Sequence, residues 1–291
     1  MAELLKGMEV ANGMKQRLID KNNELIAKGV VPCLAIVRVG GRPDDLAYER
    51  GALKRFEGLG IRVKVAEIPE SATQEAFERE FSEINGDPSV HGILLFRPLP
   101  KSLDEEPVKK LIDPEKDVDC MCAANIAKVF MGDDSGYAPC TPQAVVELLK
   151  HYEIPLAGAQ IALIGRSMVV GKPLAMLLLK ENATVTLCHS KTVNLPEVCQ
   201  RADIVVAAAG SAKMVTKDFV RPGAVVIDVG INDDGAGGIC GDVAFDEAEA
   251  ACGAITPVPG GVGSVTTSVL AMNTLKAAER ALLRPGGRPE G

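Results

Sequence analysis

Hydrophobic and polar residues follow two patterns from Val31 onward: short apolar runs of strand length, and longer amphipathic segments with helical spacing. Their alternation is typical of βαβ units that build a mainly parallel sheet. In the first half of the chain, the predicted strands cover residues 31–39, 61–68 and 92–96. The predicted helices cover residues 44–59 and a stretch with Phe77, Phe81 and Ile84 on one face. The pattern predicts a small α/β domain.

The pattern starts again near residues 138–142, where Thr141 and Pro142 supply a capping side chain and a first-turn proline for a helix. The predicted strands that follow cover residues 160–164, 184–188, 203–208 and 224–229. A last amphipathic helix ends near Leu283, and we expect it to return to the first domain. We therefore predict an α/β protein of two domains, residues 1–137 plus 266–291 and a Rossmann-like domain at 138–265.

Composition narrows the class of protein. The chain has 291 residues, of which 32 are Lys or Arg and 39 are Asp or Glu, so it lacks the basic surplus expected for binding nucleic acid. No apolar run is longer than the six residues of Leu174–Leu179, which is too short to cross a bilayer. Eight scattered cysteines, without a secretory segment at the start, are interpreted as reduced. We expect a soluble cytoplasmic protein without a metal site.

A glycine-containing loop follows the predicted strand at 160–164. It reads Gly165-Arg166-Ser167-Met168-Val169-Val170-Gly171-Lys172-Pro173, and a helix is predicted directly after it. Free backbone N–H groups at a helix N-terminus after a buried strand form a typical pyrophosphate site. The glycine spacing is not G-x-G-x-x-G, so a plain structural turn remains the alternative.

The second strand of this domain ends in Cys188-His189-Ser190-Lys191-Thr192, without the acidic residue that would bind a ribose 2′-hydroxyl. Arg166, Ser190 and Lys191 are instead suited to a 2′-phosphate. This favours NADP, with NAD as the alternative. His189 is interpreted as an ordinary polar residue at a strand end.

Four segments together resemble one enzyme family. They are Lys116-Asp117-Val118-Asp119, Tyr137-Ala138-Pro139-Cys140-Thr141-Pro142, the Gly165–Pro173 loop, and Thr256-Pro257-Val258-Pro259-Gly260-Gly261-Val262-Gly263. In this combination the chain resembles the bifunctional methylenetetrahydrofolate dehydrogenase/methenyltetrahydrofolate cyclohydrolase family. The resemblance covers nearly the whole chain.

The resemblance implies a homodimer with a folate cleft between the domains and the nicotinamide on the second domain. By position, it implies an NADP site lined by Gly165, Arg166, Ser167, Gly171, Ser190 and Ile231. It likewise implies that Pro259, Gly260 and Val262 lie along the folate, with Phe96 and Tyr48 near the one-carbon centre. Asp119 would hold the pterin ring, whose amide and amino groups suit a carboxylate acceptor. The alternative for Asp119 is a loop or cap carboxylate.

Two departures affect the hydrolytic half of the family's activity. The family's lysine, on the helix face of Tyr48, is replaced by Ala52, and its glutamine is replaced by Phe96. Lys54 and Arg50 lie about 200° around the helix from position 52, whereas Arg55 shares the azimuth of Tyr48 about 10 Å along the axis. Adding water to the methenyl carbon requires proton transfer, for which the missing pair is suited.

Oxidation makes a smaller demand, because a nicotinamide held against the methylene carbon accepts hydride without a protein acid or base. We therefore expect an NADP-dependent dehydrogenase that has lost cyclohydrolase activity. One alternative is a bifunctional enzyme in which Arg55, Arg97 or another group replaces the missing pair. Another is a catalytically silent folate- or nucleotide-binding protein. Gly263-Ser264-Val265-Thr266 also departs from the family's usual Gly-Pro-Met-Thr.

Overall fold

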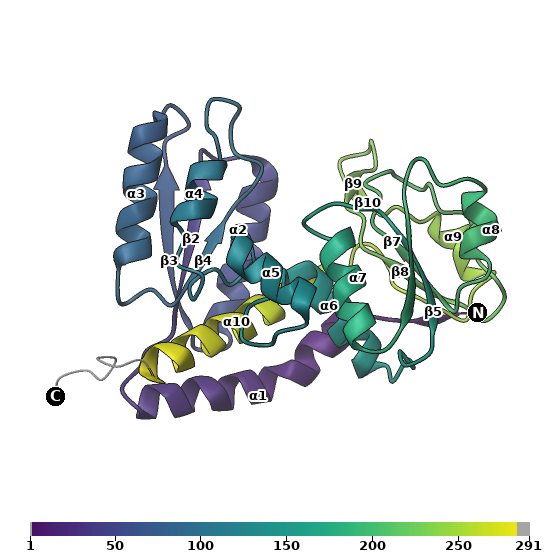
Figure 1. The fold of residues 1–291 in the computed structure, drawn as a ribbon, viewed down its shortest axis with the longest axis horizontal. Coiled ribbons are helices and arrows are strands. Elements are labelled where there is room, and N and C mark those ends of the chain that lie inside the picture. The colour runs from purple at the N-terminus through teal and green to yellow at the C-terminus, as the bar shows by residue number, and fades with distance from the viewer. Residues whose placement is uncertain (1, 284–291) are drawn as a thin grey trace. The chain divides into compact units, whose positions relative to one another are not determined.

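The computed structural model describes residues 2–283, which form two compact units (Figure 1). One unit contains residues 14–140 and 267–283, and the other contains residues 2–13 and 141–266. We call them the first and the second unit and describe each by itself. Residues 284–291, which the sequence analysis assigned to the first domain, lie outside the described part of the chain.

The first unit is built on a three-stranded parallel sheet in the order β3-β2-β4. The strands are β2 (Cys33–Val39), β3 (Arg62–Ile68) and β4 (Gly92–Leu95), as the apolar runs predicted. Central β2 is buried along its whole length. The helices are α2 (Pro43–Glu57), α3 (Gln74–Gly86), α4 (Glu106–Leu111) and α5 (Ala123–Met131). Phe77 and Phe81 of α3 are fully buried against the sheet, in a core with Val37 and Leu95.

The second unit is built on a six-stranded parallel sheet in the order β1-β11-β8-β7-β5-β6 (Figure 1). The predicted strands are present as β5 (Gln160–Ile164), β6 (Thr184–Cys188), β7 (Ile204–Ala207) and β8 (Val225–Asp228). The connecting elements are α7 (Gly171–Lys180), α8 (Leu195–Cys199), η1 (Lys217–Phe219) and α9 (Phe245–Glu249). This confirms the Rossmann-like prediction.

The strand order of the second unit determines where a ligand binds. The chain leaves β5 to form β6 on one side and then returns to form β7 on the other side of β5. Ligands of such open sheets bind outside the carboxyl ends of the strands, at the point where the order reverses. That point lies between β5 and β7, and the Gly165–Pro173 segment begins directly after β5.

The sequence analysis missed several elements. Strand β1 (Glu3–Leu4) and β11 (Ala254–Ile255) pair in parallel, which places residues 2–13 in the second unit and not in the first domain, where we had expected them. Strands β9 (Asn232–Asp233) and β10 (Ile239–Cys240) were missed as well. All four strands have two residues, which is too short to show a periodic pattern. Helix α1 (Gly7–Ala27) was detectable, since Val10, Met14, Leu18 and Leu25 repeat at helical spacing and are buried.

Two further helices lie near the ends of the predicted domains. They are α6 (Cys140–His151), where the predicted pattern restarts, and α10 (Gly263–Leu283), the predicted last helix. The boundary between the two units falls within α1 and α10 and at the start of α6. None of the helices within residues 2–283 combines the length and the apolar character needed to cross a membrane.

Candidate active site

Tyr48 and Phe96 meet at the surface of the first unit. Tyr48 lies on α2, and Phe96 follows β4, where its N–H donates to the carbonyl of Val37 over 2.9 Å. The two ring centroids are 5.6 Å apart with the planes at 82°, an edge-to-face contact. Phe96 is 7% exposed, whereas Tyr48 is 37% exposed and presents part of its ring to solvent. The resemblance had named both residues for the one-carbon site, and the structure brings them together.

Ala52 lies one helical turn after Tyr48 and is completely buried. Its methyl group leaves no polar function where the family has a lysine. Lys54 and Arg50 are exposed, as the helix geometry predicted for residues on other faces. Arg55 is half-buried, and this burial lowers the pKa of its guanidinium.

Asp119 lies close to the hydroxyl of Tyr48, and its own carboxylate has a structural partner. Oδ1 accepts a hydrogen bond of 2.9 Å from the backbone N–H of Cys140, the first residue of α6. Burial raises the pKa of Asp119 above its ordinary value. The hydroxyl of Tyr48 is buried although the residue as a whole is 37% exposed, and this burial, with Cys140 and Asp119 nearby, raises its pKa. Oδ1 of Asp119 therefore caps α6, which is the alternative interpretation, and the carboxylate also interacts with the Cys140 thiol.

Arg97 is the cation whose charge acts on this carboxyl group. It follows Phe96, is partly buried, and forms no hydrogen bond or ion pair with any of residues 2–283. Its positive charge opposes the effect of burial on the pKa of Asp119 and on that of Cys120. Arg97 is thus better placed than Arg55 to act on a ligand held by Asp119.

Asp117 has a different role from Asp119, although only Val118 separates them. The Asp117 side chain is fully buried, and its carboxylate accepts N–H groups of Met121 at 2.8 Å and Cys122 at 3.0 Å. It also accepts a 2.9 Å bond from the Asn125 side chain. Asp117 therefore holds the start of α5 and is not available to a ligand.

The loop between β5 and α7 is shaped around close backbone contacts. A Cβ atom on Gly165 would lie 2.1 Å from the carbonyl oxygen of Ala208, and one on Gly171 would lie 2.2 Å from that of Gly165. The Ser167 hydroxyl accepts the N–H of Val170 over 3.0 Å. Only glycine fits at the two close approaches, so backbone atoms line the start of α7, as a pyrophosphate site requires.

The donors predicted for a 2′-phosphate are exposed in the second unit. The side chains of Arg166 and Ser190 have no hydrogen-bond partner among residues 2–283. His189 is held in the turn, because its Nδ1 accepts the N–H of Lys191 over 3.1 Å. This local role agrees with the interpretation of His189 as a polar residue at a strand end.

The remaining predicted contacts also lie in the second unit. Ile231, after β8, is 67% exposed. Pro259 and Gly260 are exposed, whereas the Val262 side chain is only 3% exposed and offers a ligand its backbone alone. No group of three or more His, Cys, Asp or Glu side chains within the described range is arranged to hold a metal ion.

An open parallel sheet with a glycine loop at its reversal point defines a Rossmann-type dinucleotide-binding protein. Comparison with family models identifies the type. Residues 139–282 match the NAD(P)-binding domain of tetrahydrofolate dehydrogenase/cyclohydrolase, and residues 5–119 match its catalytic domain. The chain belongs to the tetrahydrofolate dehydrogenase/cyclohydrolase family, an enzyme family with an NAD(P)-binding domain.

Individual relatives extend over nearly the whole chain. A bifunctional protein FolD from Carboxydothermus hydrogenoformans is 56% identical over 281 residues, covering 96% of this chain and 98% of the relative. The crystal structure of bifunctional FolD from Campylobacter jejuni has a TM-score of 0.93 at 40% identity and covers 96% of this chain and 99% of that one. A Trypanosoma brucei FolD structure, complexed with NADP cofactor and inhibitor, has a TM-score of 0.91 at 36% identity, covering 97% and 99%.

Proposed function

We propose that this protein oxidises 5,10-methylenetetrahydrofolate to 5,10-methenyltetrahydrofolate with NADP, and that it does not hydrolyse the product. One observation carries the second half of this proposal. The Phe96 ring packs against Tyr48, and the residue one helical turn after Tyr48 is the fully buried Ala52, so neither position offers a side chain that can bind or transfer a proton.

The residues of the second unit fit NADP. The loop packs so closely at Gly165 and Gly171 that no Cβ atom fits there, and its backbone N–H groups at the start of α7 suit a pyrophosphate. Arg166 and Ser190 supply hydrogen-bond donors for a 2′-phosphate. The exposed Ile231 side chain provides an apolar contact. When bound, NADP accepts the hydride that the methylene carbon loses. NAD remains the alternative cofactor, since binding of the pyrophosphate does not discriminate between the two.

In the first unit, Asp119 binds the pterin ring. Oδ1 caps α6, and the other carboxylate oxygen accepts N–H groups of the pterin. The carboxyl group must be ionised for both oxygens to act as acceptors in this way. Burial opposes ionisation, and the nearby charge of Arg97 favours it. Arg97 therefore helps to keep Asp119 an acceptor.

The Tyr48 and Phe96 rings bound the one-carbon unit and exclude water from it. Tyr48 is a neutral hydrogen-bonding group at physiological pH, and its raised pKa extends this neutral state to more alkaline pH. Loss of hydride leaves a cationic amidinium, which aromatic ring faces stabilise. Hydride transfer therefore needs only that these groups orient the substrate.

A second candidate is the bifunctional activity for which the relatives are named. Arg97 favours it, because it is a cation beside Asp119 without a hydrogen-bond partner in residues 2–283. A guanidinium orients water or a carboxylate but does not act as a base near neutral pH, because it remains protonated there. This limitation is why the dehydrogenase without hydrolysis is our first choice.

The proposal includes a cytoplasmic homodimer, as the family resemblance implies. The eight cysteines are free thiols, which suits a reducing compartment. Strand β6 lies at the edge of its sheet and carries Leu187, which is 37% exposed, and Val193 beyond it is 79% exposed. Light scattering measures the mass directly, and a monomer at micromolar concentration would contradict the dimer.

An absorbance assay at two wavelengths tests the activity. Reduced nucleotide and methenyltetrahydrofolate are followed separately after methylenetetrahydrofolate is added with NADP, and the assay is repeated with NAD. We expect the two products to form in equal amounts, and faster with NADP. Nucleotide reduction without methenyltetrahydrofolate accumulation would support the bifunctional candidate.

A further inference from the structure

Two buried carboxylates lie close together at the carboxyl end of β8. Asp228 is the last residue of that strand and is 4% exposed, and Asp242, after β10, is completely buried. Within residues 2–283, neither forms an ion pair with a basic side chain. A buried carboxylate without a cation must be stabilised by hydrogen bonds. These two are stabilised by backbone and side-chain amides.

Asp242 accepts four hydrogen bonds from two segments. Three come from consecutive backbone N–H groups after β7, those of Ala209 at 2.6 Å, Gly210 at 2.9 Å and Ser211 at 2.8 Å. The fourth comes from the Asn232 side chain at 2.9 Å. Consecutive N–H groups of this kind form an anion site. The protein's own carboxylate fills it, so these amides fix the turn and are not available to the cofactor phosphates.

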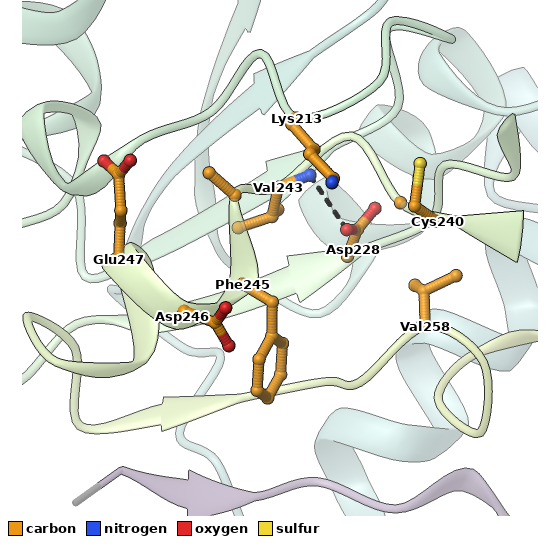
Figure 2. A pocket seen from close by; sticks show the side chains of 10 residues that line it. Lys213, Asp228, Cys240, Val243, Phe245, Asp246, Glu247 and Val258 are labelled. Carbon is orange, nitrogen blue, oxygen red and sulfur yellow. Dashed lines mark hydrogen bonds between the residues drawn. The ribbon is translucent and has the colours of Figure 1, made fainter. Parts of the chain in front are cut away.

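Asp228 connects the same region to the strand. Its carboxylate accepts the N–H groups of Gly230 at 2.9 Å, Asp242 at 3.0 Å and Val243 at 2.9 Å, the last of which is drawn in Figure 2. A Cβ atom on Gly230 would lie 2.4 Å from the Asp242 carboxyl carbon. Glycine therefore allows the two carboxylates to pack against these turns.

The hydrogen bonds of Asp228 and Asp242 fix the backbone on both sides of Ile231. Its neighbours are tied to different carboxylates, Gly230 to Asp228 through the backbone and Asn232 to Asp242 through the side chain. The Ile231 side chain itself is 67% exposed. Exposed apolar side chains on free loops adopt many conformations, and ordering one on binding a ligand costs entropy. Here the backbone on both sides is already fixed.

We propose that Asp242, supported by Asp228, is a positioning residue for the dinucleotide: it fixes the turn after β7 and Asn232 so that Ile231 is presented to the cofactor. The carboxylate acts through these groups and does not touch the ligand. The inference rests on the proposed function in one respect, the assignment of Ile231 to the NADP site.

Asp242→Asn is the most direct variant. The asparagine amide group has nearly the shape of the carboxylate, but its NH₂ faces backbone N–H donors and leaves at least one of them without an acceptor. We expect the dissociation constant for NADP to rise about tenfold, measured by calorimetry. The KM for methylenetetrahydrofolate should change less than twofold, because the Asp242 carboxylate is hydrogen-bonded to residues 209–211 and 232 and to none of the residues assigned to the folate.

Asp203→Asn is the matched control. Asp203 also accepts a backbone N–H, that of Gln160 at 2.7 Å, and pairs with Arg221, but it lies at the amino ends of the strands. We expect it to lower the melting temperature and leave NADP affinity unchanged. Asn232→Ala is a milder second variant that removes a single donor to Asp242, and it should weaken NADP binding even if Asp242→Asn fails to fold.

The outcomes separate this inference from the function on which it rests. Ile231→Ala should weaken NADP binding if Ile231 is a cofactor contact. Weakening by Ile231→Ala together with unchanged NADP affinity in Asp242→Asn, or in Asn232→Ala if the former does not fold, would overturn the positioning role alone. No weakening by Ile231→Ala would overturn the assignment of Ile231 and the positioning role together.

Discussion

The edge of one aromatic ring meets the face of the other where Tyr48 contacts Phe96, with centroids 5.6 Å apart. The Phe96 position is the one at which the resembled family has a glutamine. Exchanging an amide for a phenyl ring removes a group that can orient a proton carrier, and it adds apolar surface beside the tyrosine. This contact underlies the distinction we propose between oxidation, which we expect the protein to perform, and hydrolysis, which we expect it not to perform.

The hydroxyl of Tyr48 should act only in its neutral form. Because burial, Cys140 and Asp119 raise its pKa, we expect kcat of the oxidation to show no inflection from phenol ionisation between about pH 7 and 10. Tyr48→Phe should therefore lower kcat by a similar factor at every pH in this range. Stopped-flow rates measured across the range test the expectation, and an inflection that disappears in the phenylalanine variant would contradict it.

Asp119→Asn should damage folate binding and spare the nucleotide. Asparagine can still accept the N–H of Cys140, so the start of α6 remains capped, but it presents an NH₂ where the pterin also has donors. In the wild type, folate affinity should improve as the pH rises through the raised pKa of Asp119, and this dependence should vanish in the variant.

Asp117→Asn is the matched control for Asp119. It leaves unpaired one of the three donors that the buried Asp117 carboxylate accepts, so we expect a lower melting temperature as its main effect. Calorimetric titrations with folate and with NADP separate the two variants. Unchanged folate affinity in Asp119→Asn would remove Asp119 from the binding site.

Arg166→Ala should weaken NADP binding more than NAD binding, because only NADP carries the 2′-phosphate that the guanidinium would pair with. We expect a loss of about tenfold or more for NADP and less than twofold for NAD, read from dissociation constants at fixed ionic strength. Arg201→Ala, an exposed arginine just before β7, is the control and should alter neither. Equal losses for both nucleotides would contradict the 2′-phosphate assignment.

Asp228 should make the free energy of unfolding depend on pH. Burial, with a smaller contribution from Asp242, raises the pKa of Asp228 to about 6. The folded state therefore binds this proton more tightly than the unfolded state does. The stabilisation is complete below about pH 4 and is lost as the pH rises through about 6, in total roughly 3 kcal/mol.

The surroundings of Asp228 let solvent protons reach it. Asp228 lines a pocket of about 240 Å³, together with Lys213, Asp246, Glu247 and Cys240 (Figure 2). Urea unfolding of the wild type and of Asp228→Asn between pH 4 and 8 isolates its contribution. The difference in unfolding free energy, wild type minus variant, should fall with rising pH, and a difference that rises with pH would contradict the raised pKa.

How much the sequence revealed depended on the length of each pattern. The strands around Cys33–Val39 and Gln160–Ile164 were predictable, because buried parallel strands are continuous apolar runs. The pairing of β1 with β11 was not, since two residues have no period and their partner is distant in sequence. That pairing is why residues 2–13 group with the second unit, whereas we had predicted them in the first domain.

Some residues of the candidate site could be predicted from the sequence, and others could not. Tyr48, Phe96 and Asp119 followed from motifs, and the structure brings their side chains together. Asp228 and Asp242 were not predicted, because their hydrogen-bond partners are backbone N–H groups that carry no residue identity. The burial of Val262 was equally hidden, since its motif gives its neighbours but not the direction of its side chain.

Hydrolysis of added methenyltetrahydrofolate tests the central claim most directly. Ala52 replaces the lysine, a proton-carrying group of the kind that typically contributes about 10²–10⁴-fold, and Phe96 replaces the glutamine that orients it. The unmodified protein should therefore hydrolyse methenyltetrahydrofolate no faster than buffer. Ala52→Lys alone should add little, because Phe96 cannot orient the new ammonium group, and Ala52→Lys with Phe96→Gln should add measurable hydrolysis. Hydrolysis by the unmodified protein that exceeds the buffer rate and increases with enzyme concentration would contradict the account and establish the bifunctional enzyme instead.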